Sequence, residues 1–204
     1  MNLSKNDILI ILPLSILVIL GMIMVASSSM YVADDIASDP FYFTKRQIIF
    51  VSVGLITMTI FLLLPSNLLF KTDWIFMLIS VLLLIALFIP DVGTSVNGSI
   101  RWIRLGSINI QPSEICKFSL ILYISGYSVR RMSEIDSLRS FLKPLALLFV
   151  ISILIMGQPD LGSTAIVSLL VVGILFYAGI SFSQLGLLIL LIALLGYVAI
   201  TDSE

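Results

Sequence analysis

Apolar residues run through the chain in long stretches with few charges, each close to the 17–25 residues that a helix needs to cross a bilayer. Seven such stretches can be delimited, and each predicts a transmembrane helix: 8–26, 47–64, 74–89, 112–129, 144–157, 161–180 and 185–200. The first is too long for the apolar core of a signal peptide, which spans about 7–15 residues, so we expect a retained helix.

Three longer connections separate these stretches, at 27–46, 90–111 and 130–143. With seven spans, the first two connections lie on one side of the membrane, and the third lies on the side of the N-terminus. Basic residues favour the N-terminal side: Lys5, Lys71, Arg130, Arg131, Arg139 and Lys143, against Lys45, Arg46, Arg101 and Arg104. Because Lys and Arg concentrate in cytoplasmic loops, a cytoplasmic N-terminus and an outer C-terminus are predicted.

Composition supports a protein embedded in lipid. Of 204 residues, 59% are hydrophobic and 11% are charged, whereas a soluble domain carries about 25% charged residues. We therefore expect an all-α polytopic membrane protein of about seven transmembrane helices, with residues 1–204 in a single transmembrane domain.

Charge and residue counts also exclude several chemistries. The net charge is −1, which gives no basic field for nucleic acid. The absence of histidine removes Ser-His and Cys-His nucleophile pairs and histidine-ligated metals. The single cysteine, Cys116, lies among apolar residues, so neither a disulfide nor a metal site is expected.

The connection at 90–111 is the richest in candidate chemistry. Asn97 begins a turn, and the runs Arg101–Leu105 and Ile108–Gln111 are short and β-prone. They flank Gly106-Ser107, which suits a type II′ hairpin turn. Trp102 belongs at a membrane–water interface, which places Arg101 and Arg104 at phosphate depth. The two arginines then either anchor lipid headgroups or capture a phosphate-bearing lipid substrate.

A second candidate opens the fourth span with Gln111-Pro112-Ser113-Glu114. Pro112 suits the first position of a helix, and Glu114 can cap the free amides behind it. Alternatively, Glu114 and Lys117 share a helix face and pair. An ionisable pair inside a span is costly and faces a cavity or the bundle interior, so it is a functional candidate.

Gln158-Pro159-Asp160-Leu161-Gly162 interrupts the apolar sequence between the fifth and sixth spans. Asp160 can cap the sixth helix, or the interruption can line a cavity at membrane depth. The predicted topology puts this segment on the same side as the connection at 90–111. The resulting hypothesis is that five side chains converge on one outward-facing cavity: Arg101, Arg104, Glu114, Lys117 and Asp160.

Together these motifs resemble the SEDS family of polytopic cell-wall proteins, whose members are of the FtsW, RodA and SpoVE types. The resemblance rests on Asn97-Gly98, Arg101-Trp102, Leu105-Gly106, Gln111-Pro112-Ser113-Glu114 with Lys117, and Gln158-Pro159-Asp160-Leu161-Gly162, in that order. The segments 25–29, 39–43 and 45–47 resemble the cell-division branch, with the elongation branch of RodA type as the alternative.

The resemblance implies that the protein takes part in polymerising lipid II into glycan strands at the outer face of the bacterial inner membrane, at the division septum. It implies a class B penicillin-binding protein and other division membrane proteins as partners. It adds no cofactor, and a divalent cation stays open. The expected substrate-binding residues are Asn97, Arg101, Trp102, Arg104, Gln111, Ser113, Glu114, Lys117, Gln158 and Asp160.

The sequence departs from the family pattern in length. Family members have about ten spans, and their presumed catalytic aspartate lies in a large outer loop after the seventh. This sequence ends at Glu204, where that loop begins. We therefore expect a truncated version of the ten-helix fold, assign no catalytic residue, and expect no polymerisation by the chain alone. A lipid II flippase and a non-catalytic division scaffold are the alternative functions.

Overall fold

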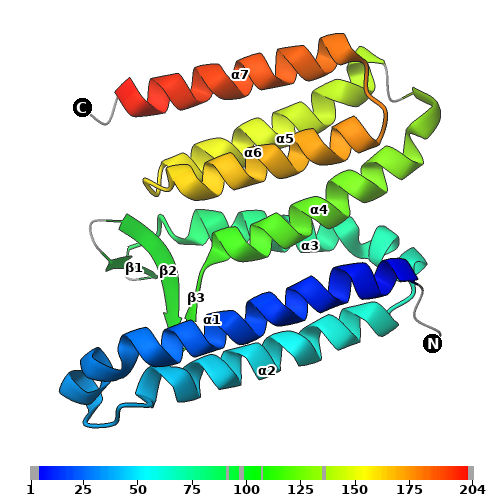
Figure 1. Cartoon of the computed structure of the whole chain (residues 1–204). Coiled ribbons are helices and arrows are strands. Elements are labelled where there is room, and N and C mark those ends of the chain that lie inside the picture. Colours follow the sequence, from blue (N-terminus) through cyan, green and yellow to red (C-terminus); the bar gives the residue numbers. More distant parts are fainter. Residues whose placement is uncertain (1–4, 91, 97–98, 107, 135–136, 202–204) are drawn as a thin grey trace. The chain divides into compact units, whose positions relative to one another are not determined.

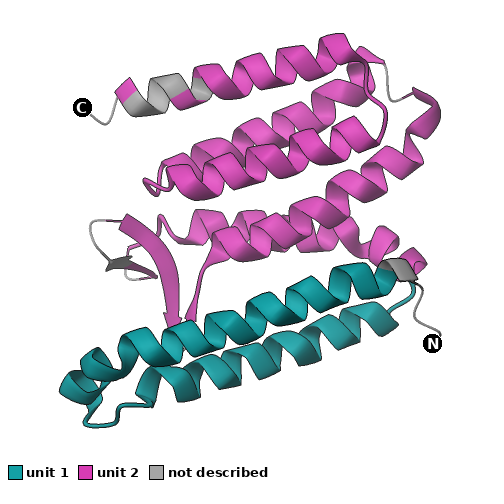
Figure 2. Ribbon diagram, in the orientation of Figure 1, with its two compact units in different colours: residues 1–65 teal, residues 66–204 magenta. Residues whose placement is uncertain are grey.

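The structure is a computed structural model that describes residues 5–90, 92–96, 99–106, 108–134 and 137–201. Within these ranges the chain forms seven α-helices and a three-stranded antiparallel sheet (Figure 1). It divides into two compact units, residues 1–65 and residues 66–204, which Figure 2 shows in different colours. The single domain expected over residues 1–204 stays a prediction.

The first unit is a helical hairpin, in which α1 (Lys5–Ala37) packs against α2 (Tyr42–Leu63). The second unit contains the remaining elements: α3 (Ser66–Ala86), β1 (Gly93–Val96), β2 (Ser99–Leu105), β3 (Ile108–Ile110), α4 (Pro112–Arg130), a short 3₁₀ helix (Met132–Glu134), α5 (Leu138–Met156), α6 (Leu161–Tyr177) and α7 (Phe182–Thr201). α3 lies along α4, and α6 packs against α4, α5 and α7 (Figure 1).

Each of the seven predicted spans falls on one of the helices, which confirms a multi-pass helical protein. In the part of the chain that the structure describes, four helices are long and apolar enough to cross a membrane: Asp7–Ala37, Tyr42–Leu63, Ser66–Ala86 and Leu138–Met156. α6 and α7 contain shorter apolar segments, Leu161–Tyr177 and Phe182–Leu194. α4 has 19 residues but is not among these four, because it is less apolar: it carries Glu114, Lys117 and Arg130 together with several serines and tyrosines.

The buried core of the second unit runs along the centre of its helix bundle. Leu84 of α3, Leu120 and Ile124 of α4, Ile151 of α5 and Val171 of α6 are all fully buried. Serines are also buried on these helices, among them Ser80, Ser119, Ser152 and Ser168. Small side chains let helices approach closely in a membrane. In contrast, α2 has no buried residue, as expected for a helix whose apolar surface faces lipid.

The predicted hairpin is present and gains a third strand. β2 pairs with β3 antiparallel, with Arg104 opposite Asn109, and Gly106 has the positive φ of +61° that the turn requires. β1, which the sequence pattern does not predict, pairs with the other edge of β2. A Cβ on Gly93 of β1 would lie 2.3 Å from Ile100 Cγ2, so only glycine allows this close pairing.

Most helices are longer than predicted, and in α1 and α5 the hydrogen bonds show how the extra residues are accommodated. α1 continues to Ala37 past Ser28 and Ser29, whose Oγ atoms donate to the carbonyls of Met24 and Val25 at 2.8 and 2.6 Å. Polar side chains bonded in this way do not end a helix. The helix ends where Ser38 adopts a φ of +50°.

α5 begins at Leu138, six residues before Pro144, so the prediction that Pro144 opens this span is wrong. Ser137 is the N-cap, and its Oγ accepts a hydrogen bond from the Ser140 amide at 3.3 Å. Pro144 has no N–H to donate to the carbonyl of Ser140 four residues earlier. Tyr127 Oη of α4 donates to that carbonyl instead, at 3.0 Å, so the proline fits inside the helix.

Candidate functional site

Strand β2 contacts the turn between α5 and α6 through two side chains, Ser99 and Arg101. Ser99 Oγ donates to the Gln158 carbonyl at 2.6 Å. The Arg101 guanidinium donates to the Pro159 carbonyl, and its Nε lies 3.9 Å from Asp160 Oδ2. The contacts join segments nearly 60 residues apart in the sequence and place the 90–111 connection against the 158–162 segment.

Asp160 both caps α6 and faces Arg101. Its Oδ1 accepts from the Ser163 amide at 3.1 Å, and its Oδ2 accepts from Ser163 Oγ at 2.7 Å. The residue is only 5% exposed. A carboxylate at a helix N-terminus interacts favourably with the helix dipole, and the nearby guanidinium adds to this effect. Asp160 is therefore engaged by both the start of α6 and the guanidinium of Arg101.

A cavity of about 520 Å³ lies beside these contacts between β2 and the α5–α6 turn. Its walls come from the end of α3, from β1 and β2, and from the α5–α6 turn, and they are mainly apolar. Gln158 contributes to the lining, and its buried Nε2 makes no hydrogen bond to the described residues. The cavity can accommodate an apolar chain, and Gln158 adds an amide side chain to its lining.

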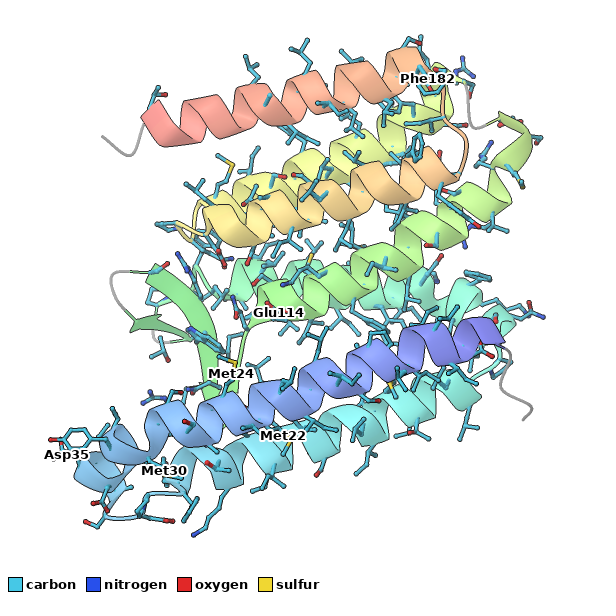
Figure 3. All side chains as sticks on the ribbon, in the orientation of Figure 1. Met22, Met24, Met30, Asp35, Glu114 and Phe182 are labelled. Atoms are coloured by element: carbon cyan, nitrogen blue, oxygen red, sulfur yellow. The ribbon has the colours of Figure 1, made fainter. Side chains whose placement is uncertain are left out.

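The predicted pair at the start of α4 is present as a separate feature. Lys117 Nζ lies 2.6 Å from Glu114 Oε1, and Figure 3 labels Glu114 near the first turn of the helix. The Lys117 side chain is 16% exposed and that of Glu114 is 58% exposed. Glu114 does not cap the helix as the alternative prediction had it: the N-cap residue Gln111 makes no side-chain capping bond, and the carboxylate is engaged by the lysine.

The other predicted site residues take different positions. Trp102 is half-buried on β2, and Arg104 is exposed on the same strand. Ser113 is buried in the first turn of α4, where its Oγ makes no hydrogen bond to the described residues. Asn97 lies outside the described residues.

The five charged residues form two pairs rather than one cluster. In the part of the chain that the structure describes, no hydrogen bond or ion pair joins Arg101 and Asp160 to Glu114 and Lys117, or Arg104 to any of the four. Of the five side chains, Arg101 and Asp160 come together across the two connections, and convergence on one outward-facing cavity stays a prediction. Within the described residues, no group of three or more Cys, Asp or Glu side chains is placed to hold a metal ion.

Sequence reasoning missed a second polar region at the other end of α3 and α4. Asp73 of α3 is 1% exposed, and its Oδ2 lies 2.8 Å from Arg130 Nη1 of α4. The two residues are 57 positions apart, so no local spacing predicts the pair. The available signal is an acidic residue placed directly before the apolar stretch that begins at Trp74.

Cys116 is fully buried in the core of the second unit, on the face of α4 that also carries Leu120. The expectation that it acts as a small apolar side chain agrees with this position, and it is a free thiol.

Comparison with known proteins gives a family over nearly the whole chain. Residues 7–203 match the FtsW/RodA/SpoVE family, described as "Cell cycle protein". A probable peptidoglycan glycosyltransferase FtsW of Legionella pneumophila is 38% identical over 188 residues, which cover 91% of this chain and 48% of the relative. The corresponding protein of Aliivibrio salmonicida is 41% identical over 164 residues, which cover 80% of this chain and 40% of the relative.

Solved structures share the fold. The crystal structure of the rod shape determining protein RodA of Thermus thermophilus aligns with a TM-score of 0.64 at 24% identity, over 87% of this chain and 58% of that one. A structure described as a peptidoglycan synthase complex that coordinates polymerization and crosslinking aligns equally well over 91% of this chain. This chain spans about half the length of the relatives that it matches in sequence. It belongs to the FtsW/RodA/SpoVE family of multi-pass membrane proteins.

Proposed function

We propose that this chain forms the part of a peptidoglycan glycosyltransferase that receives a lipid-linked, pyrophosphate-bearing donor, lipid II, during septal cell-wall synthesis. The observation that carries the proposal is the match to proteins named probable peptidoglycan glycosyltransferase FtsW over up to 99% of the chain. The elongation polymerase of RodA type is the related alternative, since the fold is shared with RodA.

The site around β2 supports this role. Lipid II combines a long apolar chain with a doubly charged phosphate linkage, so its site needs an apolar wall next to cationic donors. The 520 Å³ cavity supplies the apolar wall, and Arg101 and Arg104 lie on the strand that forms part of it. Arg101 is anchored on Pro159 and Asp160, whereas the exposed Arg104 has no acidic partner among the described residues. Arg104 is therefore the cation available to a phosphate.

No catalytic base is assigned to these residues. Glycosyl transfer needs a carboxylate within reach of the acceptor hydroxyl. Asp160 is occupied by Ser163 and Arg101, and Glu114 is paired with Lys117. Both carboxylates are engaged, so neither is proposed as the base of the reaction.

A lipid II flippase is the second candidate, because polar groups lie at both ends of the α3–α4 pair. Between these ends, however, the two helices bury Met77, Leu84, Leu120 and Ile124. This packing does not favour a polar path between the two sides, and it supports a site open on one side.

Partners and location extend the same proposal. One structural neighbour is described as a peptidoglycan synthase complex, and we infer a class B penicillin-binding protein and other division membrane proteins as partners. We also infer the bacterial inner membrane, at the division septum, as the location, with the N-terminus in the cytoplasm.

Binding of purified lipid II to the chain in detergent tests the substrate. We expect Arg104→Ala to weaken binding at least about tenfold, because a charge-assisted contact to phosphate is lost. Arg139→Ala is the matched control, since Arg139 is an exposed arginine of the same unit at the start of α5. We expect Arg101→Lys to weaken binding less than Arg101→Ala, because lysine keeps the charge but loses the planar fork. Equal affinities for the wild type, Arg104→Ala and Arg101→Ala would overturn the proposed donor site.

A further inference from the structure

A basic pocket lies at the end of the α3–α4 pair that is remote from the sheet. It has a volume of about 570 Å³ and is walled by the first turns of α3, the last turns of α4 and Lys143 of α5. We propose that it binds the phosphate headgroup of an anionic phospholipid from the leaflet on that side of the membrane. The proposal concerns a different site from the donor site above and does not rest on the proposed activity.

The charge of the lining is the first argument. Four cations line the pocket, Lys71, Arg130, Arg131 and Lys143, against one carboxylate, Asp73. Lys71 and Lys143 are exposed and have no acidic partner among the described residues, whereas Arg131 is paired with Glu134 at 2.7 Å. The pocket therefore carries a clear positive excess, and two of its cations are available to an anion.

The buried carboxylate preorganises the pocket instead of cancelling its charge. Arg130 Nη1 donates to the Phe70 carbonyl at 2.9 Å and lies 2.8 Å from Asp73 Oδ2, off the line of a hydrogen bond. The guanidinium is thus fixed by the backbone and by a charge beneath it, while 46% of its side chain stays exposed. A fixed arginine loses less entropy on binding a phosphate.

Close packing of the two helices keeps this arrangement in place. A Cβ on Gly126 of α4 would lie 2.2 Å from Asp73 Oδ2 and 3.0 Å from Arg130 Nη1. Only glycine at this position leaves room for a carboxylate and a guanidinium between α3 and α4. The pair is therefore built into the helix contact, unlike a chance encounter of surface side chains.

Aromatic and apolar side chains identify the ligand as a membrane lipid. Trp74 and Tyr123 line the pocket, and Trp and Tyr are enriched at the depth of lipid headgroups. From Trp74, the positions four and eight residues later, Leu78 and Leu82, lie on the same face of α3. These three side chains are between 50% and 56% exposed. They form an apolar stripe that begins at the pocket, along which an acyl chain can lie.

The known features of lipid-binding sites in membrane proteins agree with a phospholipid as the ligand of this pocket. Basic pockets between transmembrane helices bind phospholipid headgroups, and aromatic side chains mark the interface where those headgroups lie. A free phosphate ion would use the cations alone, whereas a phospholipid would use both the cations and the stripe.

The test is native mass spectrometry of the full chain in detergent, titrated with cardiolipin, phosphatidylglycerol or phosphatidylcholine. We expect the two anionic lipids to bind more tightly than phosphatidylcholine. The double variant Lys71→Gln/Lys143→Gln should lower their affinity at least about tenfold, because each basic side chain at the headgroup adds to binding. Arg139→Gln is the matched control: Arg139 lies one turn before Lys143 on α5, is exposed, and does not line the pocket. We expect it to change the affinity less than about twofold.

Three results would overturn the proposal. The first is an unchanged affinity in the double variant, and the second is an equal loss in Arg139→Gln, which would indicate diffuse charge attraction. The third is full displacement of the lipid by millimolar inorganic phosphate, because a free anion would then suffice. The thermal midpoint of each variant without lipid is measured in parallel, and equal midpoints show that a lost affinity comes from the pocket itself.

Discussion

Asp160 combines two roles that mutation can separate. Its carboxylate caps α6 through the Ser163 amide, and it lies near the Arg101 guanidinium. Asparagine retains a capping oxygen but has no charge, whereas alanine removes both. We expect Asp160→Ala to lower the free energy of unfolding of the bundle by about 1–2 kcal/mol, and Asp160→Asn to lower it by less.

Thermal unfolding in detergent measures both variants, with Asp35→Asn as the control because Asp35 is exposed at the end of α1. Equal losses for Asp160→Ala and Asp160→Asn would show that the charge pair, and not the cap, makes Asp160 important.

The Glu114–Lys117 pair is asymmetric, and its two partners should respond differently to removal. Lys117 is the more buried partner, with 16% of its side chain exposed against 58% for Glu114. Removing Glu114 leaves a half-buried ammonium without its counter-charge, whereas removing Lys117 leaves a carboxylate in contact with water. We expect Glu114→Ala to lower the thermal midpoint more than Lys117→Ala does, and the opposite order would contradict this account.

Some of these residues are predictable from sequence and others are not. The meeting of Arg101 with Asp160 follows from topology, because an alternation of spans puts both connections on one side. The Glu114–Lys117 pair follows from helical spacing. The pair Asp73–Arg130 does not follow from any local pattern, because its partners meet only through the packing of α3 on α4.

The position of Pro144 inside α5 leads to a prediction about two residues, Tyr127 and Pro144. A substitution of the second should offset part of the effect of a substitution of the first. Tyr127 Oη satisfies the Ser140 carbonyl that the proline leaves without a backbone donor. Tyr127→Phe should therefore destabilise the protein by about 1–3 kcal/mol, the cost of a buried, unpaired polar group. Pro144→Ala restores an N–H at the right place and should recover part of this loss in the double variant.

The measurement is again thermal unfolding, in a double-mutant cycle over Tyr127 and Pro144. Tyr123→Phe is the control, because Tyr123 stacks on Tyr127 with ring centroids 6.5 Å apart and the aromatic contact is kept. A double variant that is less stable than Tyr127→Phe alone would show that the proline contributes something other than a missing donor.

The positions of the spans were predictable from hydrophobic runs, but several ends were not. α1 continues past Ser28 and Ser29, whose side chains bond to their own helix, and α5 starts before Pro144 because another helix supplies the donor. β1 was missed because its four residues, Gly93–Val96, carry no strong strand signal. In each case the extent of the element depends on a specific interaction. The sequence pattern indicates only the average structural preference of the residue types.

Membrane orientation is the prediction that concerns the entire chain. Basic residues favour a cytoplasmic N-terminus, and the structure supplies better reporter positions than the sequence does. Pro65 precedes α3, Gly106 is the tip of the β2–β3 hairpin, and Glu134 ends the 3₁₀ helix before α5. We expect reporters fused after Pro65 and Glu134 to report the cytoplasm, and a reporter after Gly106 to report the outer side. A cytoplasmic signal at Gly106 would reverse the orientation.

The burial of Cys116 has a practical consequence for spectroscopy. It is the only cysteine in the sequence, and its side chain has no exposed surface. Water-soluble maleimides react with accessible thiols. We therefore expect almost no labelling of the natural chain at Cys116. One cysteine introduced on α2 and another on α6 would each carry a spin label, and pulsed electron resonance would then measure the distance between the two compact units in a lipid nanodisc.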